Sequence, residues 1–270
     1  MRISFIGGGN MASALIGGLL AKTAQAADMR VVEPDEATRA RLGERFGVTT
    51  FAAAEAQALR ADVVVLAVKP QQMREVARGL AGLLSGQLVI SVAAGIRCCD
   101  LSRWLGGHAR IVRTIPNTPA LIGEGITVLA GAPGLSALDR DAADAILAAV
   151  GQTLWVDDES LIDAATAISG SGPAYVFYFM EAMQAAALSL GLTGEQARQL
   201  TLATFGGAAR LAARSDEALA VLRERVTSRG GTTAAALSVM AERDVNRHIV
   251  EALAAACRRS AELGEEFGRD

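Results

Sequence analysis

Residues 3–20 read ISFIGGGNMASALIGGLL, which is an apolar strand pattern, a run of glycines and then a helical pattern. Gly7, Gly9 and Ala12 have the G-x-G-x-x-G/A spacing that opens a dinucleotide-binding βαβ unit. The first two positions exclude side chains because the backbone turns sharply and must let a pyrophosphate approach. The amides that open the next helix lack helical partners and lie at the positive end of its dipole, so they can receive phosphates. The alternative is a tight glycine turn that only joins a strand to a helix.

Strand-like and helix-like patterns alternate through the first half of the chain. The expected strands are Arg2–Ile6, Arg30–Glu33, Val48–Thr50, Asp62–Val68, Leu88–Val92, Arg110–Ile115, Gly125–Leu129 and Thr153–Val156. The expected helices are Asn10–Lys22, Asp35–Phe46, Gln71–Leu84 and Ser136–Val150. The run VVVLAV is apolar on both faces, as in a buried parallel strand. We therefore expect an α/β fold, with an N-terminal Rossmann-like doubly wound sheet that binds ligands at its carboxyl edge.

The strand patterns stop after about Asp157, and the rest of the chain is alanine-rich and helical. Expected helix starts are Ser171 with Pro173 in the first turn, Thr193 with Gln196 at capping-box spacing, Thr232-Thr233, and Asp244. We expect a dinucleotide-binding domain over residues 1–157 and an all-α domain over residues 158–270. Its apolar helices indicate an intersubunit surface, with a self-contained bundle as the alternative.

Composition excludes several classes of function. The formal net charge of −3 gives no basic field, so we expect no nucleic-acid partner. No run reaches ~18 apolar residues and no signal-peptide pattern opens the chain, so we expect no membrane partner. Cys98, Cys99 and Cys257 do not form a disulfide framework, which favours the cytoplasm. His108 and His248 lack partners at metal-ligand spacing, so we expect no metal.

Glu33 ends the second expected strand a little over twenty residues after the glycines, where an acidic residue meets the adenosine ribose. A carboxylate there favours NAD and repels a 2′-phosphate, although Arg39 in the next helix could offset it. The alternative is an ordinary exposed glutamate at a strand end.

Three further turns follow expected strands, where a sheet of this class meets its ligand. The turns are Ala67-Val68-Lys69-Pro70, Ala93-Ala94-Gly95 and the Pro116–Pro119 turn that contains Asn117. Proline ends the first strand with a fixed turn, and the small residues of the second let a nicotinamide ring approach the backbone.

Two glycine-and-hydroxyl clusters lie in the helical half, at Ser169–Pro173 and at Val226–Thr233. Glycines followed by hydroxyl residues at a helix start combine free amides with hydroxyl donors, which can bind a substrate carboxylate. An ordinary helix cap after a glycine turn explains the same residues equally well.

The lysines that the sequence lacks exclude several kinds of catalysed reaction. Tyr175 and Tyr178 have no lysine in the following turn, and the helical half contains no lysine at all, since Lys22 and Lys69 are the only two. Hydride transfer must then need little acid–base help. A protonated C=N bond is already an electrophile and carries its own proton, whereas ketone reduction leaves an alkoxide that needs a donor. An imine substrate is therefore expected.

The chain resembles the pyrroline-5-carboxylate reductase family over nearly its whole length. The segments that carry the resemblance are FIGGGNMASALIGGL, LAVKPQ, SVAAGI, IPNTPALIGEG, AISGSGPAYVF and VTSRGGTTAAAL, in that order. The resemblance implies a Rossmann domain, a helical dimerisation domain, often a ring of dimers, and an active site between subunits. It also implies NAD(P)H-dependent reduction of L-1-pyrroline-5-carboxylate to L-proline, the final step of proline biosynthesis.

Residue roles follow from the same resemblance. Ser228 and the amides of Gly231 and Thr232 would hold the substrate carboxylate, while the Thr233 hydroxyl faces the ring nitrogen as the one catalytic contact. The implied cofactor-binding residues are Gly7, Gly8, Gly9, Asn10, Met11, Ala12, Glu33, Ala67, Val68, Lys69, Pro70, Ala93, Ala94, Gly95 and Asn117.

Two positions depart from the family pattern. Arg229 stands where the family usually has proline, and Ala53 stands where it favours an asparagine that hydrogen-bonds the adenosine side of the cofactor. The family often prefers NADPH and Glu33 favours NADH, so the preference stays open. Another NAD(P)-dependent dehydrogenase of this architecture, and a protein that senses the nucleotide without turnover, are the alternatives.

Overall fold

Among the residues that the structure describes, eight strands form one sheet in the order β3-β2-β1-β4-β5-β6-β7-β8, in which β6 and β7 pair antiparallel and the other neighbours pair parallel. The computed structural model describes residues 1–22 and 24–269. The strands are β1 Ile3–Ile6, β2 Met29–Val32, β3 Thr49–Phe51, β4 Val63–Leu66, β5 Leu88–Ser91, β6 Ile111–Ile115, β7 Gly125–Gly131 and β8 Gly151–Trp155. All eight expected strands are confirmed, and the first six have the doubly wound Rossmann order.

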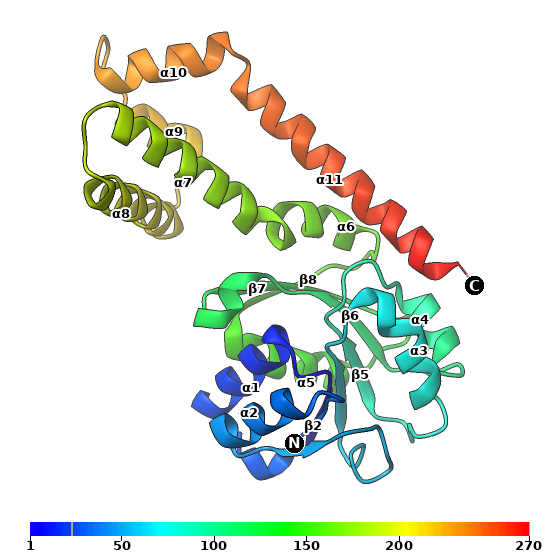
Figure 1. Cartoon of the computed structure of the whole chain (residues 1–270). Helices are drawn as coiled ribbons and strands as arrows, with labels where there is room; N and C mark the ends of the chain where they lie inside the picture. Colours follow the sequence, from blue (N-terminus) through cyan, green and yellow to red (C-terminus); the bar gives the residue numbers. More distant parts are fainter. Residues whose placement is uncertain (23, 270) are drawn as a thin grey trace. The chain divides into compact units, whose positions relative to one another are not determined.

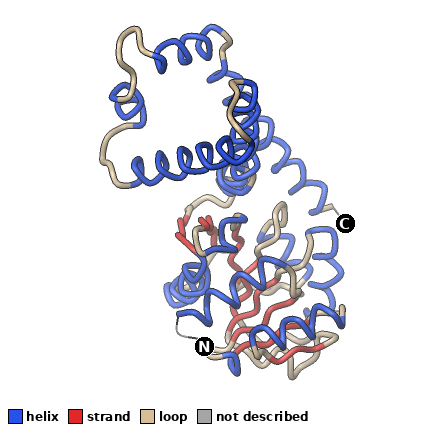
Figure 2. The backbone as a smooth tube through the Cα atoms, turned by 60° about the vertical axis from the view of Figure 1, so that its left-hand side comes forward, coloured by secondary structure: helices blue, strands red, loops and turns tan. Residues whose placement is uncertain are grey.

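Two compact units make up the chain (Figure 1): residues 1–171 with the stretch from residue 256 onward, and residues 172–255. Within the described ranges, strands occur only in the first unit, as Figure 2 shows in red. The predicted domain limit at residue 157 stays a prediction. In the structure, α6 Leu161–Ala165 and the end of α11 Val245–Gly268 belong to the unit that contains the sheet.

Helices cover both faces of the sheet (Figure 1). On one face, α1 Asn10–Lys22, α2 Glu36–Phe46 and α5 Ala137–Leu147 pack into a large buried cluster. On the other, α3 Pro70–Leu80 and α4 Cys98–Trp104 pack into a second one. The sheet is thus covered on both sides, and its central strands β1 and β4 are buried throughout.

Shorter turns complete the first unit: η1 Ala26–Asp28, η2 Thr118–Ile122, η3 Ala148–Val150 and the π-helical turn η4 Thr166–Gly170. The second unit contains α7 Gly172–Ser189, α8 Gly194–Ala213, α9 Leu219–Arg225, α10 Thr232–Glu242 and the first part of α11. Among the described residues, no helix combines the length and the apolar character that crossing a bilayer requires.

Several expected helix limits are confirmed at the level of single residues. The first helix begins at Asn10 and ends at Lys22, as expected. Thr193 accepts a hydrogen bond from the Gln196 amide, and the Gln196 side chain accepts one from Thr193 in return, which completes the capping box.

The expected helix start at Ser171 is confirmed, because α7 begins at Gly172, but Ser171 lacks the extended torsions of an N-cap residue. The chain is already helical through α6 and the π turn, and Ser171 has right-handed helical torsions with its amide bound to the Thr166 carbonyl at 2.8 Å. The extra residue of the π turn supplies this partner. The Ser169–Pro173 cluster therefore leads directly from the π turn into α7.

Gly18 lies where α1 packs closely against a neighbouring segment, and Gly43 of α2 lies where no such contact exists. A Cβ at Gly18 would lie 2.6 Å from the Ala149 carbonyl oxygen, whereas one at Gly43 would have no neighbour within 4 Å. We expect Gly18→Ala to lower the free energy of unfolding by about 1–3 kcal/mol through overpacking. Gly43→Ala, the matched control, should raise it by about 0.5–1 kcal/mol through helix propensity. Thermal unfolding of both variants measures the difference, and equal destabilisation would contradict this packing.

Candidate active site

The glycine turn after β1 lies against the end of β4, at the point where the strand order reverses. Gly7 has a φ of +96°, and a Cβ there would lie 2.6 Å from the Ala67 carbonyl oxygen. A Cβ at Gly8 would lie 2.6 Å from a methyl of Leu42. The fold itself therefore requires both glycines, because a side chain at either position would collide with a neighbour. The positive φ of Gly7 also disfavours any residue with a side chain.

Gly9 differs from its two neighbours. A Cβ at Gly9 would meet nothing within 4 Å, so no contact inside the described structure explains the missing side chain. The space beside this backbone is what a ligand approaching the turn requires. Gly9 thus fits a bound pyrophosphate, although it carries no internal packing role.

The N-terminal turn of α1 completes this anion site. Its first intrahelical hydrogen bond runs from the Ser13 amide to the Gly9 carbonyl at 2.9 Å, so the amides of Asn10, Met11 and Ala12 precede the helical ladder. The first turn contains no acidic residue. Ala12 is fully buried in the core, which matches the small third residue of the motif. These residues could hold the phosphates of a dinucleotide.

Glu33 lies at the end of β2 with its carboxylate bound to the glycine turn. It accepts hydrogen bonds from the Gly8 amide at 2.8 Å and from the Asp35 amide at 3.0 Å. Arg39 does not pair with this carboxylate; one of its guanidinium nitrogens donates to the carbonyls of Glu33 and Pro34. The carboxylate is therefore fixed beside the turn by backbone donors, which sequence reasoning did not anticipate.

Asp35, two residues further on, caps α2. Hydrogen bonds from Thr38 lower the pKa of the Asp35 carboxyl below its ordinary value, and its oxygen lies 2.7 Å from the Thr38 amide. A second carboxylate therefore remains ionised near the end of β2, and it reinforces the negative charge there.

The turns after β4 and β5 reach the same carboxyl edge of the sheet, because these strands run parallel to β1. Lys69 precedes Pro70, the first residue of α3, and its side chain is exposed. Ala93 is buried, and Gly95 has a φ of +71°. The structure thus brings three of the expected cofactor segments to one sheet edge.

Asn117 follows β6 and is fixed from both ends of its carboxamide. Its oxygen accepts from the Ile126 amide at 3.0 Å, and its nitrogen donates to the Ser169 carbonyl at 3.2 Å. The π turn therefore presents the carbonyl that orients this side chain. No signal in the sequence indicates this pairing, because it depends on the π turn, which adds a single residue to a helical segment.

The second unit contains the remaining expected residues in the turn before α10. Gly230 has a φ of +70°, and the Gly231 amide donates to the Ser228 carbonyl at 3.0 Å. A Cβ on Gly231 would lie 2.4 Å from the Ser228 hydroxyl oxygen, so that hydroxyl lies directly over the start of the helix. The expected helix start at Thr232 is confirmed.

This helix start is also suited to an anion. The first intrahelical bond runs from Ala235 to the Gly231 carbonyl at 3.1 Å, which leaves the amides of Thr232, Thr233 and Ala234 ahead of the ladder. The first turn of α10 contains no acidic residue. Amides and a hydroxyl converge here as a carboxylate requires.

Known proteins are similar to this chain over nearly its whole length. A family model described as pyrroline-5-carboxylate reductase dimerisation matches residues 159–263, and one described as NADP oxidoreductase, coenzyme F420-dependent, matches residues 2–95. A pyrroline-5-carboxylate reductase of Pseudomonas aeruginosa is 46% identical over 99% of this chain and 98% of its own length.

Solved structures show the same similarity. A pyrroline-5-carboxylate reductase of Coxiella burnetii has a TM-score of 0.91 at 41% identity, covering 97% of this chain and 98% of its own. A pyrroline carboxylate reductase of Plasmodium falciparum with NADP bound has a TM-score of 0.87 at 29% identity, with 98% of each chain covered.

The fold, the glycine turn and these matches together define an NAD(P)H-dependent oxidoreductase with a Rossmann sheet and a helical dimerisation region. Within that class, the chain belongs to the pyrroline-5-carboxylate reductase family.

Gly9 gives the sharpest test of the dinucleotide site. We expect Gly9→Ala to leave the thermal unfolding midpoint near that of the unaltered protein, since its Cβ meets no neighbour. Dinucleotide binding should weaken by about tenfold or more, because the methyl group takes space that the ligand needs. Gly8→Ala is the control and should lower stability through its clash with Leu42. Undiminished affinity of Gly9→Ala in a fluorescence titration would remove the pyrophosphate from this turn.

Proposed function

We propose that this chain reduces L-1-pyrroline-5-carboxylate to L-proline with NAD(P)H, as the final step of proline biosynthesis in the cytoplasm. The observation that carries the proposal is the turn before α10, where the Ser228 hydroxyl lies over a helix start that contains no carboxylate. The similarity to reductases of this name extends over the same turn and over the glycine turn.

The turn before α10 would bind the substrate through its carboxylate. The amides of Thr232 and Thr233 precede the helical ladder and lie at the positive end of the helix dipole, so an anion is favoured there. The Ser228 hydroxyl adds a donor at the same place. Binding at one end of a small molecule fixes the orientation of the rest, which lowers the entropic cost of reaching the reactive arrangement.

The chemistry demands little of the protein beyond positioning. When bound, the nicotinamide cofactor supplies the hydride. The Thr233 hydroxyl, one residue into α10, orients the ring nitrogen of the substrate instead of protonating it, because an alcohol is far too weak an acid at neutral pH. An iminium carbon already accepts hydride, and the amine that forms keeps the proton of the nitrogen. No lysine of the helical unit is needed, and the sequence contains none there.

Thr233→Ala tests this role. We expect turnover to fall about ten- to a hundredfold if the hydroxyl contact strengthens in the transition state. Thr233→Ser keeps the hydroxyl and is the matched control, so it should retain most of the activity. The rates of the two variants are compared at saturating substrate and cofactor. An alanine variant as fast as the unaltered protein would remove Thr233 from the mechanism.

The cofactor is proposed to bind at the carboxyl edge of the sheet, with Asn117 near the nicotinamide. The residues proposed to hold it are the turn Gly7, Gly8 and Gly9, the amides of Asn10, Met11 and Ala12, and the segments Ala67–Pro70 and Ala93–Gly95. Fixed by two backbone amides, Glu33 places a negative charge where a 2′-phosphate would lie, and Arg39 is engaged with carbonyls. We therefore propose that NADH competes with NADPH.

Glu33→Gln tests the source of this selectivity. Removing the charge should raise the ratio of kcat/KM for NADPH to that for NADH by about tenfold, which corresponds to about 1.4 kcal/mol of relieved repulsion. Glu36→Gln, at the first residue of α2, is the control and should leave the ratio unchanged. Steady-state rates with each cofactor give the two ratios. An unchanged ratio in Glu33→Gln would show that this carboxylate does not choose the cofactor.

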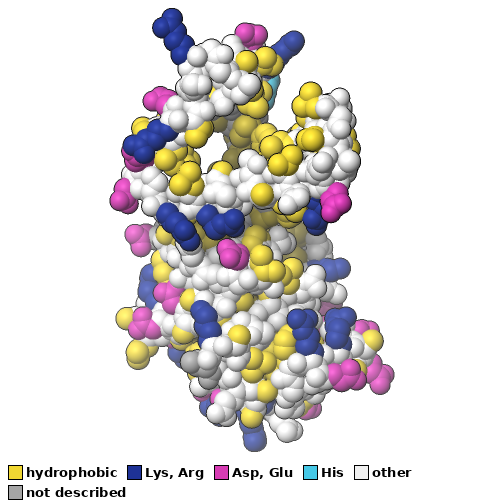
Figure 3. Space-filling view, turned by 90° about the vertical axis from the view of Figure 1, so that its left-hand side faces the viewer, with side chains coloured by type: hydrophobic (Ala, Val, Ile, Leu, Met, Phe, Trp, Pro, Cys, Tyr) yellow, Lys and Arg dark blue, Asp and Glu magenta, His cyan; other side chains and the backbone are white. Residues whose placement is uncertain are grey.

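The helical unit is proposed to be completed by a second copy of the chain, and the resemblance extends this to a ring of dimers. None of the described residues of α7, α9 and α10 is buried. Hydrophobic side chains instead reach the surface on these helices and on α8 (Figure 3), including Phe177, Tyr178, Leu200, Leu211, Val239 and Met240. An apolar surface of this extent is typical of an obligate interface. The match to a dimerisation family supports the same conclusion.

The function is tested by following the near-ultraviolet absorbance of NADH and of NADPH on addition of pyrroline-5-carboxylate. We expect oxidation with this substrate and much slower oxidation with small keto acids. Faster turnover of a keto acid would favour a different dehydrogenase of the same architecture. Cofactor binding without oxidation by either substrate would favour a nucleotide sensor.

A further inference from the structure

The turn between β5 and α4 is covered from behind by the end of the chain. Gly95 lies at the centre of this turn, and a Cβ there would lie 3.1 Å from the Phe267 ring and 3.3 Å from the Leu263 Cβ. Phe267 also packs against the buried cluster that contains Trp104. The last turns of α11 and the Ala93–Gly95 segment are therefore in direct contact within the first unit.

Arginines from three different places bind backbone carbonyls in the C-terminal part of α11, two of them, those of Phe267 and Gly268, in its last turn. Arg74 of α3 donates to Phe267 at 3.0 Å, Arg97 of the turn donates to Ala261 at 3.4 Å, and Arg103 of α4 donates to Gly268 at 2.7 Å. Cations are favoured at a helix C-terminus, where the last carbonyls lack helical partners. The guanidinium of Arg74 also lies over the Trp104 ring. The end of the helix is thus held by the residues that flank the turn.

Small residues on one face of α11 make this contact close. Ser260, Gly264 and Gly268 are spaced four apart, so they share a face of the helix. A Cβ at Gly264 would lie 3.0 Å from the Arg97 Nε, and one at Gly268 would lie 2.6 Å from an Asp100 carboxylate oxygen. Larger residues at these two positions would push the helix away from the turn.

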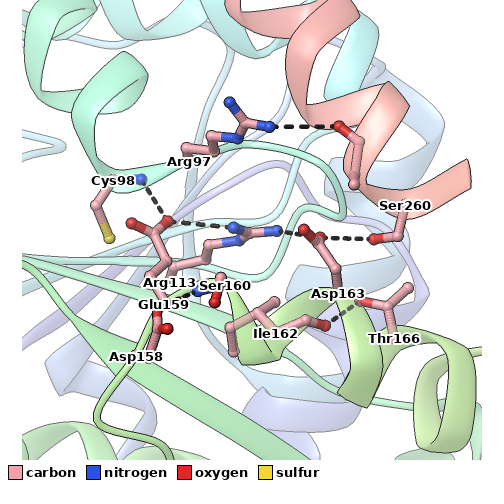
Figure 4. A network of polar contacts seen from close by, with 11 residues as sticks. Arg97, Cys98, Arg113, Asp158, Glu159, Ser160, Ile162, Asp163, Thr166 and Ser260 are labelled. Carbon is pink, nitrogen blue, oxygen red and sulfur yellow. Dashed lines mark hydrogen bonds and ion pairs between the residues drawn. The ribbon is translucent and has the colours of Figure 1, made fainter. Parts of the chain in front are cut away.

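A buried polar network fixes the other side of the same turn (Figure 4). Arg113 of β6 is 3% exposed and pairs with Glu159 and Asp163, each at 3.2 Å. Glu159 accepts from the Cys98 amide at 2.8 Å, and Asp163 accepts from the Ser260 hydroxyl at 2.8 Å. One ion-pair network therefore joins the start of α4 to α11.

Cys98 does not add reactivity to this network. Burial raises the pKa of its thiol to about 12, with the nearby Glu159 carboxylate acting in the same direction. The thiol stays protonated at neutral pH, so the polar groups around it serve the position of the turn and not a nucleophile.

We propose that the C-terminal segment 260–268 positions the Ala93–Gly95 turn for the cofactor, with Phe267 as its main contact. The inference rests on the proposed function only in taking this turn as a cofactor contact. The turn has small side chains, so its own backbone would form the contact surface. A glycine at positive φ has wide conformational freedom, and its position depends on what packs behind it. The end of the chain would thereby tune cofactor affinity without touching the cofactor.

The proposal is tested with Phe267→Ala, with Phe267→Leu as the conservative variant and Glu262→Ala as the control. Glu262 lies on the same helix and its side chain is exposed. Its ion pair with Arg259 contributes little to the free energy of unfolding. Two readouts are measured on the full-length protein: the Kd for NADH and NADPH by fluorescence titration, and amide hydrogen exchange of residues 93–97 in the ligand-free protein. The KM for pyrroline-5-carboxylate is measured alongside.

We expect Phe267→Ala to weaken cofactor binding by about tenfold. Exchange should rise in residues 93–97, while the amides of β1 and β4 keep their protection. The KM for pyrroline-5-carboxylate should change much less than the cofactor Kd. Phe267→Leu should recover most of the affinity, and Glu262→Ala should match the unaltered protein.

Two results would overturn the proposal: unchanged affinity and exchange in Phe267→Ala, or exchange that rises equally throughout the sheet, since Phe267 would then stabilise only the fold. If Phe267→Ala does not fold, the same comparison is made with Gly264→Ala, whose Cβ would lie 3.0 Å from the Arg97 Nε, and normal cofactor affinity in that variant would contradict the proposal. Cofactor binding without turnover of pyrroline-5-carboxylate in the unaltered protein would count against the proposed function instead, and would leave this test valid.

Discussion

The structure depends on the close approach of the glycine turn after β1 to the carbonyl end of β4. Gly7 lies so near the Ala67 carbonyl that any side chain would collide, and its positive φ excludes most other residues. This contact lets the two central strands end together at the place where the strand order reverses. The crevice of a doubly wound sheet opens there. The start of α1, the Glu33 carboxylate and the turns after β4 and β5 are all arranged around it.

The same physical device occurs twice in the chain. Both α1 and α10 begin after glycines, have no carboxylate in their first turn and present amides that precede the helical ladder. The partial positive charge at a helix start comes from backbone amides and requires no ionisable side chain. An anion can therefore bind there whatever the protonation state of nearby side chains. At the two proposed sites, this device would let a chain with two lysines bind a phosphate-rich cofactor and a carboxylate substrate. In the proposed site, Glu33 would add the negative charge that discriminates against a 2′-phosphate, and the C-terminal segment would position the turn after β5.

Local patterns predicted much of this arrangement, because glycine torsion, capping boxes and buried strands leave short-range signals. The limits of α1, the Thr193 cap, all eight strands and the start of α10 follow from neighbouring residues alone. The antiparallel direction of β7, the π turn before Ser171 and the bond between Glu33 and Gly8 depend on residues far apart or on one added residue in a turn, which no local pattern encodes. The return of the C-terminus to the sheet unit left one readable trace, the small residues Ser260, Gly264 and Gly268 at a spacing of four.

The most direct measurement is a crystal structure of the protein with L-proline and an oxidised nicotinamide cofactor. The account predicts that the proline carboxylate binds the amides of Thr232 and Thr233 beside the Ser228 hydroxyl. It also predicts the pyrophosphate over Gly9 and the start of α1. Proline bound away from the turn before α10, or a cofactor whose phosphates do not contact the glycine turn, would contradict it.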